Sequence, residues 1–340
     1  MNKLTWLHKN LFNNWYNSLL TIICSIFIFW VAKGCLFWAF NQAQWQVIQV
    51  NLHLFLVGRF PQNLYWRIWI VLGINTFLTV ITWSLFNKKT NFIKSRFDKS
   101  LTPVLAPIWL LAFTINIWLI GGGFGLQSVS TNLWNGLLLT LLMAIVSIVL
   151  SFPLGVLLAL GRTSNLFLIR WFSVLYIEIV RGLPLIGILF IAQVMLPLFL
   201  PPDLRLDRLI RGIAGLVLFS AAYMAENVRG GLQSIPRGQI EAAKALGFNP
   251  PLFIILIVLP QALRAVIPAI VGQFIGLFKD TSLLSLVGLV ELTGIARSIL
   301  AQPRFLGRYA EVYIFIGLIY WLFCYSMSLA SRRLEKQLSS

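Results

Sequence analysis

The hydrophobic positions of this chain are grouped in long blocks separated by short polar segments. A helix that crosses a membrane needs roughly 20 consecutive apolar residues. Eight blocks of about this length are predicted spans: 18–40, 66–86, 103–120, 132–160, 183–200, 210–228, 256–278 and 309–330. The pattern therefore predicts an all-α, polytopic integral membrane protein with about eight transmembrane helices. Residues 166–181 are predicted to be an amphipathic lead-in, because counting them as a further span would invert the topology of everything that follows.

The composition supports this prediction. The chain is 59% hydrophobic and 11% charged, with a mean hydropathy of +0.84. A soluble globular protein carries about 25% charged residues. The first apolar run is predicted to be an uncleaved span, since Lys33 lies just before any cleavage point. Cys24, Cys35 and Cys324 lie in apolar spans without CxxC spacing, so neither a metal site nor a disulfide framework is indicated.

The net charge of +17 raises the possibility of a nucleic-acid partner, but its distribution indicates a membrane protein instead. Cytoplasmic loops of membrane proteins are enriched in Lys and Arg. With both termini in the cytoplasm, that side holds Lys3, Lys9, Lys88, Lys89, Lys94, Arg96, Lys99, Arg162, Arg170, Arg229, Arg237, Lys244, Arg332, Arg333 and Lys336. The outer side holds Arg59, Arg205, Arg208, Arg211, Arg297, Arg304 and Arg308. The sequence contains no recognisable nucleic-acid-binding module, and membrane lipid is the expected environment.

The chain divides into three parts by composition. Residues 1–120 form an N-terminal extension with three predicted transmembrane helices and a polar, basic linker at 87–100. Residues 121–130 form a Gly-rich outer loop that is expected to be flexible. Residues 131–340 carry a dense set of motifs.

The segment 236–260 predicts a helix, a tight turn and a second helix. Residues 239–246 contain no helix breaker, and Pro236 suits the start of a helix. Gly247 can adopt the left-handed conformation that ends a helix. Asn249 and Pro250 then signal a new helix start. Such a helical pair can fill a groove on a partner protein.

The same segment resembles the EAA motif of ABC-importer permeases. Glu241, Ala242 and Ala243 are followed by Gly247, and then by Ile257, Leu259 and Pro260 at the spacing of that motif. The resemblance implies that this loop is cytoplasmic and couples to an ABC ATPase. The alternative is an amphipathic loop whose small residues only allow close packing, and the complete spacing inside a polytopic protein argues against it.

Further motifs extend the resemblance over about residues 130–336. Tyr176–Glu178 with Arg181–Leu185, the segment 222–231, the segment 260–264 and the segment 279–283 are similar to boxes of the polar amino-acid (histidine/glutamine-type) permeases. The three extra spans resemble the extended permeases of general or neutral L-amino-acid systems. Departures from the family pattern are Leu183, Gly187, Ala269 and Gly272, and they leave the substrate open.

The resemblance implies a type I (MetI-like) ABC permease core at 131–340, with its coupling loop at 236–260. It also implies ABC ATPase subunits, a second permease subunit in a heterodimer, and a periplasmic or surface amino-acid-binding protein. ATP and Mg are expected on the ATPase, because this chain has no G-x-x-x-x-G-K-[ST] sequence. The sequence shows no catalytic or metal-ligating cluster, so a transporter subunit of the bacterial inner membrane is expected rather than an enzyme.

Polar and charged side chains in the spans, or at their ends, are candidates for the translocation path or its gate. They are Glu178, Arg181, Glu226, Lys279, Asp280, Thr281 and Ser282, with Glu291 as a further candidate. Glu178 and Arg181 can instead form a structural ion pair at i, i+3. Lys279 and Asp280 can pair or shape an outer gate, and the hydroxyls can simply bind backbone carbonyls. Breaks at Gly182, Pro184 and Pro268 can line a cavity or be ordinary kinks.

An ion-coupled secondary transporter or channel for a small polar solute is the alternative function. It predicts inverted repeats and a coupling carboxylate in mid-span. We find no internal repeat, although Glu178 or Glu226 could supply such a carboxylate.

Overall fold

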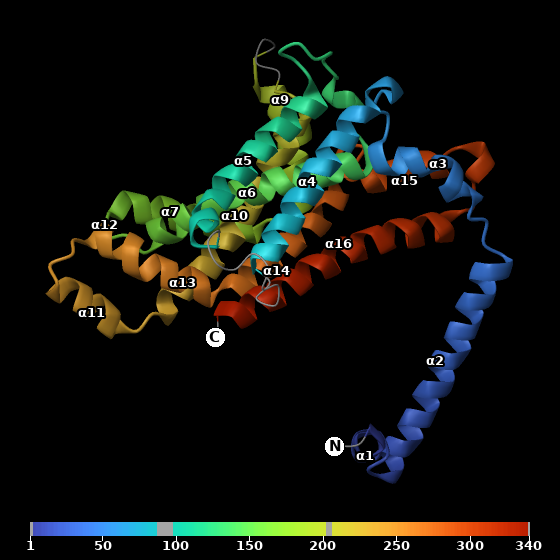
Figure 1. Cartoon of the computed structure of the whole chain (residues 1–340), viewed down its shortest axis with the longest axis horizontal. Helices are drawn as coiled ribbons and strands as arrows, with labels where there is room; N and C mark the ends of the chain where they lie inside the picture. The colour runs from blue at the N-terminus through green and yellow to red at the C-terminus, as the bar shows by residue number, and fades with distance from the viewer. Residues whose placement is uncertain (1–2, 87–97, 202–205, 339–340) are drawn as a thin grey trace.

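The computed structural model describes residues 3–86, 98–201 and 206–338, and over these ranges the chain is all-α (Figure 1). The extended contacts within them are two isolated bridges, Gly123 with Leu126 and Gly136 with Glu291. Helices satisfy their own backbone hydrogen bonds, which is what a chain surrounded by hydrocarbon requires. The predicted fold class is confirmed. The predicted linker at 87–100 lies mostly outside the described residues.

The described part of the N-terminal extension contains five α-helices and a 3-10 turn (Gln62–Leu64). The α-helices are α1 (Lys3–Leu11), α2 (Trp15–Asn41), α3 (Gln46–Val57), α4 (Tyr65–Phe86) and α5 (Asp98–Gly121). Helix α2 extends away from the rest of the molecule and buries none of its residues (Figure 1). Helices α4 and α5 pack together, and Trp109 donates a hydrogen bond to Thr82 across them at 3.1 Å.

The Gly-rich segment after α5 differs from the expected flexible loop. The buried Arg67 of α4 donates a hydrogen bond to the carbonyl oxygen of Gln127 at 2.8 Å. Val129 is buried in the largest apolar cluster, whereas Phe124 at the tip of the loop is 99% exposed. The Arg67 hydrogen bond and the burial of Val129 therefore fix the C-terminal flank of the loop to the body.

Two long helices, α6 (Gly136–Arg162) and α10 (Arg208–Ser234), form the centre of the remaining bundle. Small residues permit their close approach, as is common between membrane helices. A Cβ atom on Gly155 of α6 would lie 2.5 Å from the Met224 side chain of α10. Ala221 and Met224 are fully buried in this contact. Helices α7 and α14 both pack on this central pair.

Within the described residues, six helices are long and apolar enough to cross a membrane, or seven if one bent pair counts as a single span. The bent pair consists of α7 (Phe167–Gly182) and the segment Leu185–Phe199, which meet at 103°. The expected lead-in at 166–181 is thus a separate helix, and the chain turns sharply at Leu183 and Pro184. The expected span at 103–120 lies in α5, whose apolar stretch Pro107–Gly121 is shorter than a full span.

The expected span at 256–278 is not one helix. It is divided among α12 (Pro250–Phe253), a π-helical turn (Ile254–Val258), α13 (Leu259–Ala265) and α14 (Ile267–Asp280). Val266 leaves helical geometry, and Pro268 lies in the first turn of α14. The candidate span here is Ile267–Val287, which includes a 3-10 turn from Thr281 to Val287.

Both π-helical turns in the described chain precede a proline by the same spacing. One (Ile191–Met195) joins α8 (Leu185–Phe190) to α9 (Leu196–Phe199), two residues before Pro197; the other ends two residues before Pro260. Proline lacks an N–H group and its ring crowds the carbonyl four residues earlier. Widening the preceding turn accommodates that ring, so Pro260 reshapes the helix without ending it.

The remaining elements are α11 (Arg237–Ala245), α15 (Leu292–Leu300) and α16 (Tyr309–Leu338). Helix α16 packs along α14 and α15. The guanidinium of Arg333 lies 3.9 Å from the ring centre of Trp83, so the end of α16 also contacts α4. The N-terminal extension therefore contacts the motif-rich part of the chain at two places. Trp83 of α4 meets Arg333, and α3 packs against α6, α15 and α16.

Candidate coupling and translocation site

The segment 236–260 forms a helical protrusion at one end of the bundle (Figure 1). Helix α11 ends in a complete Schellman motif. The Phe248 N–H donates to the Ala243 carbonyl oxygen at 3.1 Å, and the Gly247 N–H donates to that of Lys244 at 2.9 Å. Gly247 has φ = +80°. Asn249 then caps α12 by accepting from the Leu252 N–H at 3.2 Å. The predicted helix, turn and second helix are all present.

The motif residues divide between an inner and an outer face of this protrusion. Ala243, Phe253 and Val258 are buried together, and Ile257 packs against them. Glu241, Ala242 and Pro260 are exposed, and Leu246 is 76% exposed at the tip. The small side chain of Ala243 allows α11 to lie close to the following helix. The protrusion is thus internally packed while its outer face is free.

The candidate residues Glu178, Arg181 and Glu226 lie together beside this protrusion. The Glu226 carboxylate lies 2.7 Å from Arg229, 2.9 Å from Arg162 and 3.5 Å from Arg181. Its side chain is only 15% exposed. Arginine can bind carboxylates through several N–H groups, which suits it to a shared site of this kind. The ends of α6, α7 and α10 are joined by this network.

The predicted pair between Glu178 and Arg181 does not form. Glu178 instead pairs with Arg162 of α6 at 3.0 Å, and Arg181 turns to Glu226 of α10. Residues three apart are neighbours on a helix surface, but the partners on adjacent helices are better placed here. Arg162 and Arg229 were not among the predicted site residues. Two signals were available in the sequence: Arg229 follows Glu226 by three residues, and Arg162 ends the long apolar run of α6.

The second group of candidates, at 279–282, lies where α14 gives way to the 3-10 turn. Lys279 and Asp280 form no ion pair within the described chain, because adjacent residues on a helix face different directions. The Thr281 hydroxyl donates to the Phe278 carbonyl oxygen at 2.6 Å. Ser282 supplies the carbonyl oxygen that accepts from Ser285 at 2.9 Å. The structure does not bring this group together with Glu226.

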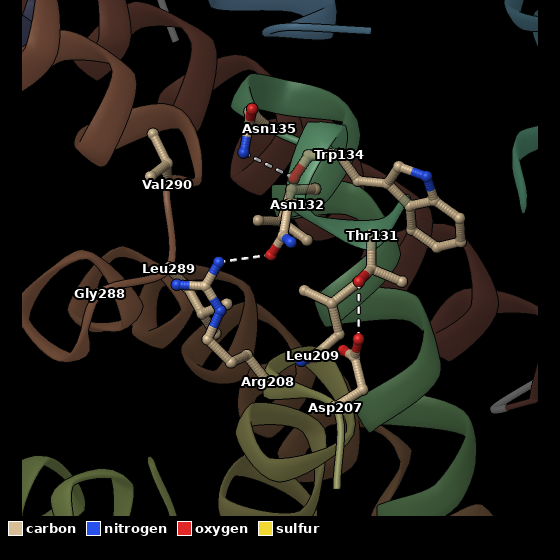
Figure 2. Close-up of a pocket in the computed structure, with 11 residues that line it drawn as sticks. Thr131, Asn132, Trp134, Asn135, Asp207, Arg208, Leu209, Gly288, Leu289 and Val290 are labelled. Atoms are coloured by element: carbon tan, nitrogen blue, oxygen red, sulfur yellow. Dashed lines mark hydrogen bonds between the residues drawn. The ribbon is translucent and has the colours of Figure 1, made fainter. Parts of the chain in front are cut away.

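Figure 2 shows the small cavity where the start of α6, the start of α10 and residues 288–290 meet. Asp207 accepts a hydrogen bond from Thr131 at 2.6 Å and caps α10 through the Leu209 N–H at 2.7 Å. Arg208 donates to Asn132. The cavity holds about 30 Å³, which is enough for roughly one water molecule. Polar contacts therefore close this end of the bundle.

Glu291, the further candidate, is fully buried beside that cavity. It caps α15 by accepting from the N–H groups of Thr293 (2.8 Å) and Gly294 (3.0 Å), and it accepts from the Tyr320 hydroxyl at 3.1 Å. Burial raises the pKa of Glu291 to about 7. Its contacts are those of a structural cap that joins α15 to α16.

The all-α membrane fold, the helical protrusion at one end and the polar closure at the other end define a class of protein. The chain is an integral membrane transport subunit. A family model described as "Binding-protein-dependent transport system inner membrane component" matches residues 151–340. The chain belongs to this family. It is a multi-pass inner-membrane permease of an ABC importer, and ATP hydrolysis resides in a separate subunit.

Curated relatives cover most of the chain. The chain is 40% identical to "Inner membrane amino-acid ABC transporter permease protein YhdY" of Escherichia coli, over 99% of this chain and 93% of that protein. It is 34% identical to "Glutamate/glutamine/aspartate/asparagine transport system permease protein BztC" of Rhodobacter capsulatus, over 98% and 93%.

A solved structure is similar to part of the chain. It is described as "Crystal structure of an amino acid ABC transporter with histidines", and it matches with a TM-score of 0.54 and 30% identity. The match covers 59% of this chain and 92% of that chain. This likeness and the family model agree on the permease fold.

Proposed function

We propose that this chain is the permease subunit of an amino-acid importer and that residues 236–260 are its ATPase-coupling loop. The observation that carries the coupling role is the protrusion itself, which is packed on its inner side and exposed at Glu241, Ala242 and Leu246. An amphipathic helix with a free face can bind in a groove of a partner. The names of its relatives support amino acids as the substrate class.

In this proposal, a second permease subunit completes the path and a binding protein delivers the amino acid to the outer face. The second permease is a different chain, which gives a heterodimer. ATP and Mg bind to the ATPase subunits, and their closure moves the two coupling loops. Helix α5, which packs along α4, is counted as a crossing in this proposal, so that both termini lie in the cytoplasm on the same side as Arg162 and Arg229 at the ends of α6 and α10.

The division into an extension (1–120), an outer loop (121–130) and a permease domain (131–340) belongs to the same proposal. Glu226, with Glu178 and Arg181, forms an inner gate, because this network ties three helix ends together. Lys279, Asp280, Thr281 and Ser282 line the path or its outer gate, at the break between α14 and the 3-10 turn.

The coupling role is tested by the substitution Gly247→Val, with Gly230→Val as its matched control. Gly247 has φ = +80°, where an L-residue costs roughly 1–2 kcal/mol and a β-branched one more. Gly230 lies in α10, outside the proposed coupling loop, with open space around it, so valine is tolerated there. We expect Gly247→Val to reduce co-purification of the ATPase subunit while both variants insert in the membrane normally. Equal recovery of the ATPase with both variants would refute the coupling role.

The amino-acid assignment needs a separate measurement. The complete importer, reconstituted with its binding protein, should show ATPase activity that one or more amino acids stimulate. Stimulation by other solutes alone would redirect the substrate class and leave the coupling role intact. Uptake driven by an ion gradient without any ATPase subunit would instead favour a secondary transporter.

A further inference from the structure

A cavity of about 550 Å³ lies at the coupling end of the bundle. Its walls come from the end of α6, the connection to α7, the first half of α7 and the last turns of α10. The charged and amide side chains that line the cavity are Arg162, Asn165, Arg170, Arg229 and Gln233. Three of these five are arginines, and two are amides that can donate hydrogen bonds. None of the described residues that line the cavity carries a carboxylate.

Positive charge exceeds negative charge around this cavity. The adjoining ion network contains four guanidinium groups if Arg170 is included with Arg162, Arg181 and Arg229. It contains two carboxylates, those of Glu178 and Glu226. Arg170 forms no ion pair within the described chain and is exposed. The cavity therefore has unneutralised charge that favours an anion.

The same part of α7 carries large apolar side chains that no described part of the chain covers. Phe167 and Leu168 are 76% and 75% exposed, and Trp171 and Phe172 are 55% and 61% exposed. They surround Arg170 in the sequence. A helix with exposed aromatic and aliphatic side chains next to basic ones is typical of the boundary between headgroups and acyl chains.

We propose that this cavity binds the phosphate group of an anionic phospholipid, with the acyl chains against the exposed apolar side chains of α7. Basic pockets between membrane helices are suited to anionic headgroups. Arginine also matches the geometry of a phosphate group. A free inorganic phosphate would use the guanidinium groups alone, and the apolar side chains beside Arg170 are what favour a lipid.

The bound lipid would act on the coupling loop through α10. Gln233 lines the cavity, and Ile235, two residues later, packs in the buried cluster of the coupling loop. Arg229 contacts both the cavity and the Glu226 carboxylate. A headgroup held by Arg162 and Arg229 would thus restrain the ends of α6 and α10 together.

The test measures lipid binding to the purified full-length chain by native mass spectrometry, using phosphatidylglycerol and phosphatidylcholine. Arg170→Gln removes the charge that no carboxylate neutralises, so the fold is not endangered. Each basic residue near an anionic surface contributes enough to change the dissociation constant about fivefold. We expect Arg170→Gln to weaken phosphatidylglycerol binding by that factor, and Arg170→Lys to retain most of it. Arg332→Gln, at an exposed position of α16, is the matched control and should change nothing.

Several outcomes would overturn the proposal. One is equal weakening by Arg170→Gln and Arg332→Gln, which would indicate general surface attraction. Another is equal binding of the two lipids by the unmodified chain. Inorganic phosphate that binds with the same dependence on Arg170 and displaces the lipid would identify a free-anion site. Loss of the ATPase subunit from Arg170→Gln with unchanged lipid binding would identify a protein contact instead. None of these outcomes depends on which solute the importer carries.

Discussion

Adjacent glycines near the end of α10 provide a sharp test of the structure, because the same substitution meets different surroundings at each. A Cβ atom on Gly231 would lie 2.5 Å from the carbonyl oxygen of Ala262 and 3.0 Å from the Val266 side chain. A Cβ atom on Gly230 would have nothing within 4 Å. Gly231 is therefore the contact through which α10 packs on α13, directly after the coupling loop.

The magnitudes follow from this geometry. Alanine in place of glycine stabilises a helix by about 1 kcal/mol, and this gain is common to Gly230→Ala and Gly231→Ala. The clash with a backbone carbonyl occurs only at Gly231, and overpacking of this kind costs typically about 1–3 kcal/mol. The difference between the two variants therefore isolates the clash. Gly230→Ala should be neutral or stabilising, and Gly231→Ala should be less stable than it by about 1–3 kcal/mol.

The assay is thermal unfolding of the two purified variants and the unmodified chain in one detergent. We expect a lower melting temperature for Gly231→Ala only, together with reduced recovery of the ATPase subunit because α13 is displaced. Indistinguishable melting temperatures for Gly230→Ala and Gly231→Ala would refute the α10–α13 packing described above.

Three further predictions follow from the charged groups. Glu226→Gln should destabilise the chain by roughly 2 kcal/mol, somewhat below the cost of breaking a fully buried pair. Glu178 has a side chain that is 56% exposed, so Glu178→Gln should cost at most about 1 kcal/mol. Equal melting temperatures for the two variants would contradict the network. In a cysteine-free background, Lys244→Cys should react with an impermeant thiol reagent only after cells are opened, whereas Phe124→Cys should react in intact cells; the reverse result would invert the topology. Glu291 lies outside the candidate spans, and its pKa of about 7 exceeds the ordinary value of 4.5. Between these two pH values the folded chain keeps the proton that the unfolded chain has lost. The free energy of unfolding should therefore fall as the pH rises from 4.5 to about 7. Glu291→Gln should remove this dependence, and an unchanged pH profile would count against the buried carboxyl.

The local sequence was sufficient for the coupling loop. Pro236, Gly247 and Asn249 each impose a backbone preference that acts over one or two turns, so the helix boundaries were predictable within two residues. The apolar runs likewise predicted an all-α membrane protein. The break of the 256–278 run at Val266 was harder to predict, because Pro268 is compatible with both a kink and a new helix.

The sequence alone determined the class of the chain and the position of the helix, turn and second helix at 236–260, because block hydrophobicity and helix-ending residues act locally along the backbone. Only the tertiary structure decided which charges meet. Arg162, Glu178, Glu226 and Arg229 come from α6, α7 and α10, and their pairing depends on how closely small residues let these helices approach. Helix packing decides which charged side chains pair in this protein. The spacing of two charged residues in the sequence predicts their pairing less well, as Glu178 and Arg181 show.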